Sequence, residues 1–249
     1  MQNCEQNNEM IIIKKEDIAP LFLPLAKNCH KGDLGQLVIV GGSKNYVGAP
    51  LLAEAGAAAM RVGAGLNILA VPSFLMNPLR ERVLTSSLFE LSDNANSIVF
   101  NLSEFQTLSK RTTAYSVGMG FMDGEADKIA SYILNETKCN FVLDADGLKT
   151  ACKSIFDFKN RAVLTPHLGE FSNITGIPIE EIKNNAEKIA CKFAKERKCV
   201  LVLKSHQSII TDGEKVFRNS TGNAKLAKGG SGDVLAGIVG GLLARGVSP

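Results

Sequence analysis

The sequence predicts an α/β fold in which a mostly parallel central sheet lies between two layers of helices. Short β-rich apolar runs alternate along the chain with segments of helical pattern, which is typical of repeated strand-helix units. The apolar runs are continuous and do not alternate with polar residues, as in strands that are buried on both faces of a sheet. With 249 residues, 45% of them hydrophobic, the chain is long enough for one large domain with a full core.

Five strand-helix units are predicted in order along the chain. The strands are expected at residues 37–40, 66–71, 114–118, 140–145 and 162–166. The helices that follow them are expected at residues 49–63, 76–84, 126–134, 147–152 and 168–175. Residues 178–198 mix apolar and charged positions as on a solvated amphipathic helix.

A different pattern follows toward the C-terminus. Three short runs at residues 200–205, 208–211 and 215–219 are separated by polar turns. The dipeptide Asp212-Gly213 is typical of a hairpin turn, so we expect an antiparallel hairpin here. The apolar, glycine-rich residues 234–246 are too few to cross a membrane and predict a buried helix. We interpret residues 1–12 as a polar tail or linker stub and residues 13–249 as one domain.

Composition and charge exclude several classes of protein. The formal net charge is only +3, and basic residues are scattered among acidic ones, so no nucleic-acid-binding stripe is present. The six cysteines contain no CxxC pair and are expected to be reduced thiols. The three histidines lack zinc-like spacing, and no signal peptide opens the chain. We therefore expect a cytoplasmic protein that binds neither nucleic acid nor a membrane.

Polar and glycine-rich loops follow the predicted strands. They comprise residues 41–49, 118–120, 144–148, 165–170 and 204–208. Each loop alone is an ordinary turn or cap. Because the carboxyl ends of parallel strands meet at one edge of a sheet, the loops together predict a large polar cleft there.

The stretch NAKLAKGGSGDVLAG, residues 223–237, predicts an anion site at the start of a helix. Gly229, Gly230 and Gly232 allow the backbone to approach a ligand closely. The first N–H groups of the helix have no acceptor within the helix, and they lie at the positive end of its dipole. The local pattern leaves two roles open for Asp233, a capping carboxylate or a functional one.

Several motifs, in order, resemble those of one known family. They are HKGDLGQLVIVGGS, GAPLLAEAGAAAMRVGAG, VLDADGL, LTPHLGE and GGSGDVLAGIVGGLLARG. From about Ile13 onward, the chain resembles the ADP- or ATP-dependent NAD(P)H-hydrate dehydratases of the ribokinase-like superfamily. The resemblance implies a ribokinase-like three-layer fold. It also implies magnesium-assisted dehydration of 6-hydroxy NADH or NADPH, through transient phosphorylation of the hydroxyl and loss of phosphate, with ADP as the favoured nucleotide.

The resemblance also implies roles for individual residues. Asp233 would take the proton from the hydroxyl, and the N–H groups of Gly230, Ser231 and Gly232 would form an anion hole for the phosphoryl group. The hydrated dinucleotide would touch Ala49, Gly120, His167 and Asp233. The nucleotide would lie along Lys204, Ser205, His206, Gln207 and Ser208, with Gly232 on its other side. The structural alternatives are a helix start at Ala49, a tight turn at Gly120 and loop histidines at 167 and 206.

Three carboxylates of the predicted cleft have two open interpretations. Asp144, Asp146 and Glu170 could position magnesium through water, because this cation prefers oxygen ligands and keeps several waters. They could equally be turn and cap carboxylates. They are not assigned as direct metal ligands, so the metal ligands stay unknown.

Departures from the family pattern concern the anion loop and the ends of the chain. Lys225 and Leu226 stand where the family usually has Gly-Met, and the chain stops soon after the final motif, as in a C-terminally truncated domain. The polar start suits a junction with an epimerase domain, fused or separate. We expect a homo-oligomer, with a tetramer as one candidate.

Two other functions are compatible with parts of this pattern. A ribokinase-like kinase for a vitamin-precursor alcohol would share the phosphoryl transfer, but its product would keep the phosphate. A nucleotide-binding regulatory protein with a relict site is disfavoured by the intact GGSGD motif.

Overall fold

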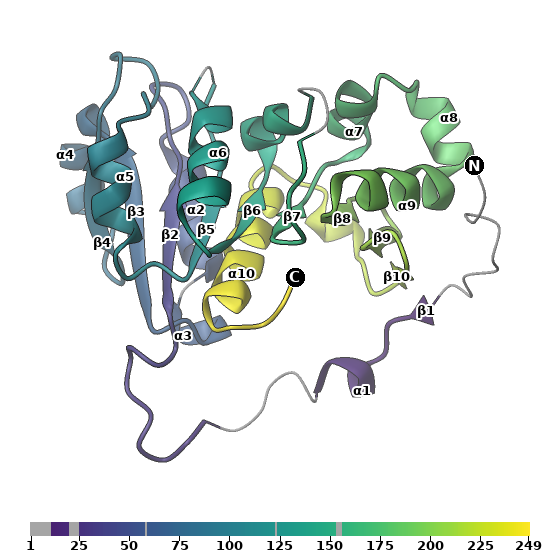
Figure 1. The fold of residues 1–249 in the computed structure, drawn as a ribbon, viewed down its shortest axis with the longest axis horizontal. Coiled ribbons are helices and arrows are strands. Elements are labelled where there is room, and N and C mark those ends of the chain that lie inside the picture. Colours follow the sequence, from purple (N-terminus) through teal and green to yellow (C-terminus); the bar gives the residue numbers. More distant parts are fainter. Residues whose placement is uncertain (1–10, 20–24, 58, 123, 153–155) are drawn as a thin grey trace.

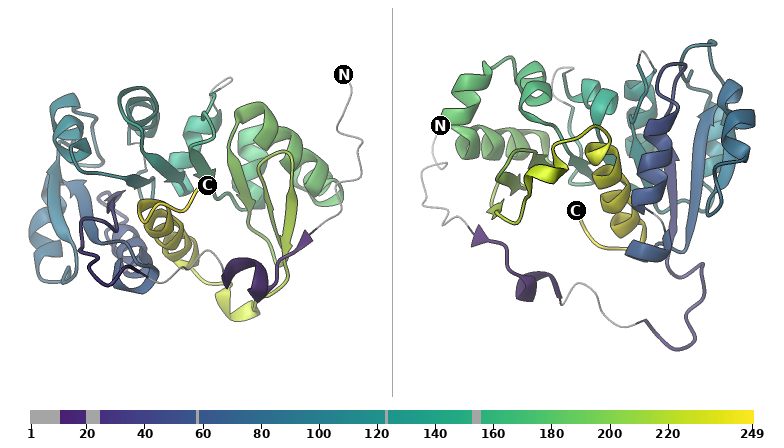
Figure 2. Two further views of the ribbon diagram at one scale, coloured as in Figure 1. Left: turned by 60° about the horizontal axis from the view of Figure 1, so that its bottom comes forward. Right: turned by 180° about the vertical axis from the view of Figure 1, so that it is seen from behind.

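The computed structural model describes residues 11–19, 25–57, 59–122, 124–152 and 156–249. In this part of the chain one ten-stranded sheet has the order β1-β10-β9-β8-β7-β6-β5-β2-β3-β4. Figures 1 and 2 show helices on both faces of the sheet, which confirms the predicted three-layer arrangement.

The strands and helices have the following bounds. The strands are β1 (Ile11–Ile12), β2 (Gln36–Val40), β3 (Leu66–Pro72), β4 (Ser87–Leu91), β5 (Ala114–Val117), β6 (Asn140–Leu143), β7 (Ala162–Leu164), β8 (Val200–Leu203), β9 (Ser208–Thr211) and β10 (Val216–Asn219). The α-helices are α1 (Lys15–Ile18), α2 (Gly48–Ala57), α3 (Ala59–Val62), α4 (Met76–Arg80), α5 (Leu102–Ser109), α6 (Ala126–Glu136), α7 (Leu168–Thr175), α8 (Ile179–Asn184), α9 (Ala186–Arg197) and α10 (Ser231–Ala244). Short 3-10 helices are η2 (Ser73–Leu75), η3 (Ala145–Cys152) and η4 (Ala224–Leu226).

The direction of the strands follows the prediction. In the part of the sheet with the order β8-β7-β6-β5-β2-β3-β4, all neighbouring strands are parallel. Strand β9 is antiparallel to both β8 and β10, which confirms the expected hairpin. In its turn, the Asp212 carboxylate accepts the N–H groups of Glu214 and Lys215, both at 2.8 Å. This Asx-type bonding stabilises the reversal of the chain.

Two apolar cores lie on opposite faces of the sheet. Val38 and Val40 of β2 pack into one core, beneath α5, α6, α7 and α9, whereas Leu37 and Ile39 pack into the other, beneath α2 and α10. Successive side chains of a strand point to opposite faces, so a strand buried on both sides must be apolar throughout. This explains why the central strands are recognisable as continuous apolar runs.

Some predicted elements differ from the observed ones. The helix expected at residues 76–84 ends already at Arg80, and residues 145–152 form the 3-10 helix η3. The expected helix at 178–198 divides at Asn185, whose backbone leaves the helical conformation. Strand β4 was missed, because in the described part of the chain this edge strand pairs with β3 alone and most of its residues are partly exposed. Without burial on both faces it lacks a continuous apolar run.

The N-terminal residues fall partly outside the description. The predicted polar tail covers residues 1–12, of which residues 1–10 lie outside the described residues. Ile11 and Ile12 form β1 and pair in parallel with Phe217 and Arg218 of β10. Within the described ranges, none of the helices is long and apolar enough to span a membrane. In the same ranges, Cys29, Cys139, Cys152 and Cys199 carry free thiols, and the Cys191 thiol donates to the Gly213 carbonyl at 3.1 Å.

Helix α10 approaches the sheet closely at its C-terminal end. Gly35, just before β2, has a φ of 73°, and a Cβ there would lie 1.9 Å from the carbonyl oxygen of Ala244. The same carbonyl accepts the Thr113 hydroxyl at 2.9 Å. A side chain at position 35 would therefore displace the end of α10.

We expect Gly35→Ala to destabilise the protein strongly. The added methyl group meets rigid backbone, so the loss should be at least about 3 kcal/mol of unfolding free energy. Gly176 offers a matched control, because it has the same φ of 73° but nothing within 4 Å of its would-be Cβ. Gly176→Ala should cost only about 1 kcal/mol, the conformational penalty. Urea unfolding of both variants tests this, and equal losses would contradict the packing argument.

Candidate active site

The predicted polar loops meet at one edge of the sheet. They follow β2, β5, β6, β7 and β8, which all run in the same direction. Hydrogen bonds tie the loops to one another: Gly42 N–H donates to the Met119 carbonyl at 2.8 Å, and Lys204 N–H to the Pro166 carbonyl at 2.8 Å. The edge is therefore a connected rim.

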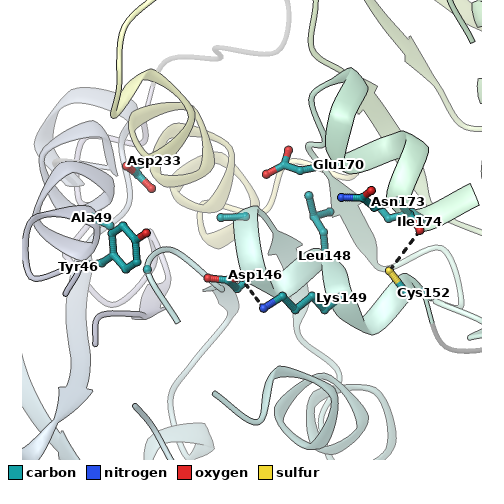
Figure 3. Close-up of a pocket in the computed structure, with 12 residues that line it drawn as sticks. Tyr46, Ala49, Asp146, Leu148, Lys149, Cys152, Glu170, Asn173, Ile174 and Asp233 are labelled. Carbon is teal, nitrogen blue, oxygen red and sulfur yellow. Dashed lines mark hydrogen bonds and ion pairs between the residues drawn. The ribbon is translucent and has the colours of Figure 1, made fainter. Parts of the chain in front are cut away.

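A cavity of about 420 Å³ opens in this rim. Of the residues predicted to touch the dinucleotide, Ala49, Gly120 and Asp233 line it, and His167 does not. Figure 3 shows Asp233 on the side of α10 and Glu170 across the cavity on α7. The remaining lining residues are Tyr46, Ala145, Asp146, Leu148, Lys149, Cys152, Asn173 and Ile174. A mostly apolar wall with a few convergent polar groups is typical of a small-molecule site.

Asp233 occupies the first turn of α10. Burial raises the pKa of its carboxyl to about 6, and the neighbouring Asp144 charge adds to this rise, while Lys204 opposes it. Gly230, which has no side chain to cap the helix, occupies the N-cap position of α10, and Asp233 is an acidic residue of the first turn. A carboxyl group with a pKa in this range is suited to accept a proton near neutral pH.

The anion loop requires glycine at position 230. Gly230 has a φ of 87°, and a Cβ there would lie 2.5 Å from Cδ1 of Leu52 on α2. The N–H of Ser231 is partly engaged, since it donates to the Lys228 carbonyl at 3.4 Å. Lys225 and Leu226, which depart from the family pattern, lie on the exposed helix η4.

A partly buried ion pair lies against the start of α10. The ammonium of Lys204 is 2.8 Å from Asp144 and 3.9 Å from Glu170. A Cβ at Gly232 would be only 3.2 Å from the Lys204 ammonium and 3.4 Å from the Asp144 carboxylate. A fixed cation therefore stands beside the positive end of the α10 dipole, an arrangement that favours bound phosphate.

His167 is the N-cap of helix α7. Its Nδ1 accepts the Glu170 N–H at 3.1 Å, and the Glu170 carboxylate accepts the His167 N–H at 2.7 Å. This reciprocal pair forms a capping box. The imidazole is 59% exposed, and its Nε2 lies 3.6 Å from the Glu170 carboxylate.

The turn between β8 and β9 carries the rest of the predicted nucleotide stretch. The Ser205 hydroxyl donates to the Gln207 carbonyl at 2.8 Å, and the Ser208 hydroxyl to the Ser205 carbonyl at 3.2 Å. The Gln207 side chain accepts from Arg218 at 2.9 Å, and His206 is exposed. These bonds give the turn a fixed shape beside Lys204.

The three cleft carboxylates have protein partners. Asp144 accepts the Thr165 hydroxyl at 2.6 Å as well as Lys204, and Glu170 belongs to the capping box. Asp146 accepts the Met122 N–H at 2.9 Å. Over the described ranges, no group of three His, Cys, Asp or Glu side chains is arranged to hold a metal ion. Asp146 and Glu170 thus have turn and cap partners, and binding of magnesium through water by the three carboxylates stays a prediction.

Several cavity residues were not predicted from the sequence. Tyr46 and Lys149 both line the cavity, but neither belongs to a motif that requires a particular chemistry. The only signal was position, because Tyr46 lies inside the loop 41–49 and Lys149 directly follows the loop 144–148. Tyr46 is 54% exposed, and Figure 3 places its ring on the Ala49 side of the cavity.

Comparison with known proteins identifies the family of this chain. The family model described as NAD(P)H-hydrate dehydratase matches residues 37–249. A bifunctional NAD(P)H-hydrate repair enzyme of Hyperthermus butylicus is 36% identical over 242 residues, which cover 94% of this chain and 44% of the relative. An ADP-dependent (S)-NAD(P)H-hydrate dehydratase of Neisseria meningitidis is 32% identical, with 91% of this chain and 75% of the relative covered.

A solved structure has the same fold. The crystal structure of an ADP/ATP-dependent NAD(P)H-hydrate dehydratase from Bacillus subtilis, co-crystallised with ATP/Mg²⁺, superposes with a TM-score of 0.79 at 25% identity. The match covers 96% of this chain and 83% of that one. This chain spans less than half the length of the bifunctional relatives, as the 44% coverage above shows. With its ribokinase-like three-layer fold and a family match from residue 37 to 249, the chain belongs to the NAD(P)H-hydrate dehydratase family.

Proposed function

We propose that this chain catalyses the nucleotide-dependent dehydration of hydrated NADH and NADPH, with release of phosphate. The observation that carries the proposal is the position of Asp233. Its half-buried carboxyl, with a pKa raised to about 6 by burial and by Asp144, lines a cavity beside the α10 N-terminus. Relatives named as dehydratases of this substrate support the same activity.

The proposed reaction has two stages. A ring hydroxyl is a poor leaving group, so it is first converted to a phosphate ester: Asp233 takes the hydroxyl proton while the oxygen attacks the terminal phosphoryl group of the nucleotide. The N–H groups at Gly230 and Gly232, together with the Lys204 ammonium, stabilise the charge of the moving phosphoryl group. Loss of a ring proton and of phosphate then restores the double bond. ADP would leave as AMP, and ATP as ADP.

The two substrates are proposed to lie on opposite sides of Asp233. The cavity between Ala49, Gly120 and Glu170 would hold the hydrated ring, with His167 contributing from the rim. The turn from Lys204 to Ser208 would hold the nucleotide, with Gly232 between the two sites. A Cβ at Gly232 would approach Lys204 to 3.2 Å, so glycine leaves the space that a phosphate needs beside the ammonium.

Magnesium fits this site as a companion of the nucleotide. The described carboxylates do not form a direct cage, and Asp144 and Glu170 are the ones nearest the Lys204 ammonium. Magnesium is commonly held by substrate phosphates and water with one or two carboxylates. These two side chains would bind waters of the ion, and the bound ion would neutralise phosphate charge.

Partners are proposed from the lengths and names of the relatives. Because the bifunctional repair enzymes are more than twice as long as the matched region, we propose that an epimerase for the same damaged cofactor works with this domain, fused or as a separate protein. A homo-oligomer, such as a tetramer, remains a prediction. The kinase alternative is not favoured: hydroxyethylthiazole kinase and pyridoxal kinase structures reach TM-scores of 0.53 and 0.52 at 16% identity, which shows a shared fold alone.

The direct test is to incubate the protein with hydrated NADH, magnesium and either ADP or ATP. Return of dihydronicotinamide absorbance together with released phosphate would support the proposed function. No absorbance with either nucleotide, alongside phosphorylation of a vitamin-precursor alcohol, would favour a kinase.

Asp233→Asn is expected to lower turnover by at least about a hundredfold, because positioned proton transfer contributes about 10² to 10⁴ in rate. The amide is nearly isosteric with the carboxylate, so the unfolding free energy should stay within about 1 kcal/mol of wild type. Steady-state kinetics and urea unfolding measure the two quantities. Near wild-type turnover combined with a clear loss of stability would mean that Asp233 serves as a cap.

The raised pKa of Asp233 predicts a pH dependence. The carboxylate is the active form, so kcat/KM should rise with pH and reach half its plateau near pH 6, the pKa given by burial and Asp144. Stability changes with pH in the opposite direction. The pKa of Asp233 is higher in the folded than in the unfolded state, so protonation of Asp233 favours the folded state. The resulting contribution to the free energy of unfolding is lost as pH rises from about 4 to about 6. Asp233→Asn should remove both inflections. An unchanged pH-rate profile in a residually active variant would show that another group titrates.

His167 can be tested with two variants that separate capping from binding. His167→Asn keeps a good N-cap, whereas His167→Ala removes it at a cost of about 1 kcal/mol. If the imidazole binds the dinucleotide, both variants should weaken dinucleotide affinity more than nucleotide affinity, although only the alanine variant loses stability. Calorimetric titration with each ligand measures this. Full dinucleotide affinity in His167→Asn would leave His167 with its capping role alone.

A further inference from the structure

The turn after β5 contains an unusual backbone conformation. Gly118, Gly120 and Met122 have φ values of 119°, 72° and 55°, respectively. Glycine adopts such angles freely, but a residue with a side chain does so only where its surroundings compensate for the steric cost. Met122 therefore calls for an explanation from its neighbours.

Two side chains of η3 hold both polar groups of the Met122 backbone. Its N–H donates to Oδ2 of Asp146 at 2.9 Å, and its carbonyl accepts from Nζ of Lys149 at 2.9 Å. Lys149 also pairs with Oδ1 of Asp146 at 2.9 Å, as the dashed line in Figure 3 marks. The three contacts form a closed ring, which we term the Met122 clamp.

Close backbone contact brings η3 within reach of this turn. A Cβ at Gly118 would lie 2.3 Å from the Gly147 nitrogen and from the Asp144 carbonyl oxygen. A Cβ at Gly147 would lie 2.4 Å from the Val117 carbonyl oxygen. The two loops thus touch without an intervening side chain, and Asp146 and Lys149 reach Met122 from a fixed base.

The clamped turn forms one wall of the cavity. Gly120 lies between Gly118, which contacts the η3 loop, and Met122. A Cβ at Gly120 would lie 2.7 Å from Cβ of Tyr46 and 3.1 Å from Cβ of Ala49. Because the backbone at Gly120 already lies so close to Tyr46 and Ala49, a shift of the turn toward or away from α2 changes the width of the cavity directly.

We propose that Asp146 and Lys149 are a positioning pair that fixes the turn 118–122 and thereby sets the affinity of the cavity for the hydrated dinucleotide. The affinity part rests on the proposed function. Both oxygens of Asp146 are engaged here, one with Met122 and one with Lys149. Lys149 is 63% exposed, and an ion pair this open to solvent contributes little to global stability. This ion pair instead stabilises the local backbone of the turn 118–122.

The first test measures the clamp without any assay of activity. Hydrogen exchange, read by NMR or by mass spectrometry of short peptides, reports the protection of the Met122 amide. Asp146→Ala removes its acceptor and should speed exchange by at least about tenfold, whereas Asp146→Asn keeps an oxygen acceptor and should have a smaller effect. Lys149→Met should speed exchange of the Met122 amide by an amount between the effects of Asp146→Asn and Asp146→Ala.

The matched control is Lys183→Met on α8. Lys183 pairs with Glu180 at 2.7 Å, also three residues apart and exposed, but far along the chain from the Met122 turn. It should leave Met122 exchange unchanged, and all the variants should melt within about 3 °C of wild type. If Asp146→Ala does not fold, Lys149→Met, which removes only an exposed cation, still decides the outcome.

The second test is kinetic. Lys149→Met and Asp146→Ala should raise KM for hydrated NADH by about tenfold, and Lys149→Arg should restore it, while KM for the nucleotide stays within about twofold. Equal losses for both substrates, or unchanged Met122 exchange, would overturn the proposal. A wild-type protein with no dehydratase activity would contradict the proposed function and with it the affinity part, and the exchange result alone would then support or overturn the clamp.

Discussion

The close packing of α10 against the sheet is the constraint on which the site depends. Gly240 brings the helix so near that a Cβ there would be 3.0 Å from Leu37 and 3.1 Å from Ser116. The Ser116 hydroxyl donates to the Ala236 carbonyl at 3.2 Å, which ties the middle of the helix to β5. Because a helix is rigid over this length, these contacts fix its first turn at the rim, and with it Asp233 and the anion loop.

Burial and the charges around that first turn explain the raised pKa of Asp233. Lys204 lies 2.8 Å from Asp144 and 3.9 Å from Glu170, and its charge lowers the Asp233 pKa less than burial and the Asp144 charge raise it. Burial and the Asp144 charge then dominate and raise the Asp233 pKa to about 6. Separation of roles among nearby carboxyl groups is a common feature of acid-base sites.

Sequence reasoning identified the fold and the rim because both depend on local signals. Central strands such as β2 must be apolar throughout, and glycine-rich loops follow strand ends, so both are visible in one sequence. The edge strand β4 has no such signal. In the site, Ala49, Gly120 and Asp233 were expected together and do share the cavity. The partners of Asp146 and Glu170 could not be foreseen, because whether a carboxylate meets Met122, a helix N–H or a metal is decided by contacts between loops distant in sequence.

The position of α10 in the chain has a consequence for synthesis. Helix α10 follows, in sequence, every strand that it covers, and it carries Asp233. While the ribosome is still making the C-terminal segment, the apolar face formed by Leu37, Ile39 and Ala114 has no α10 over it. A nascent chain at this stage exposes apolar surface of the kind that chaperones recognise. The anion loop and the proposed base arrive together with the helix that packs on this face, so burial of these three side chains by α10 and assembly of the site coincide in time.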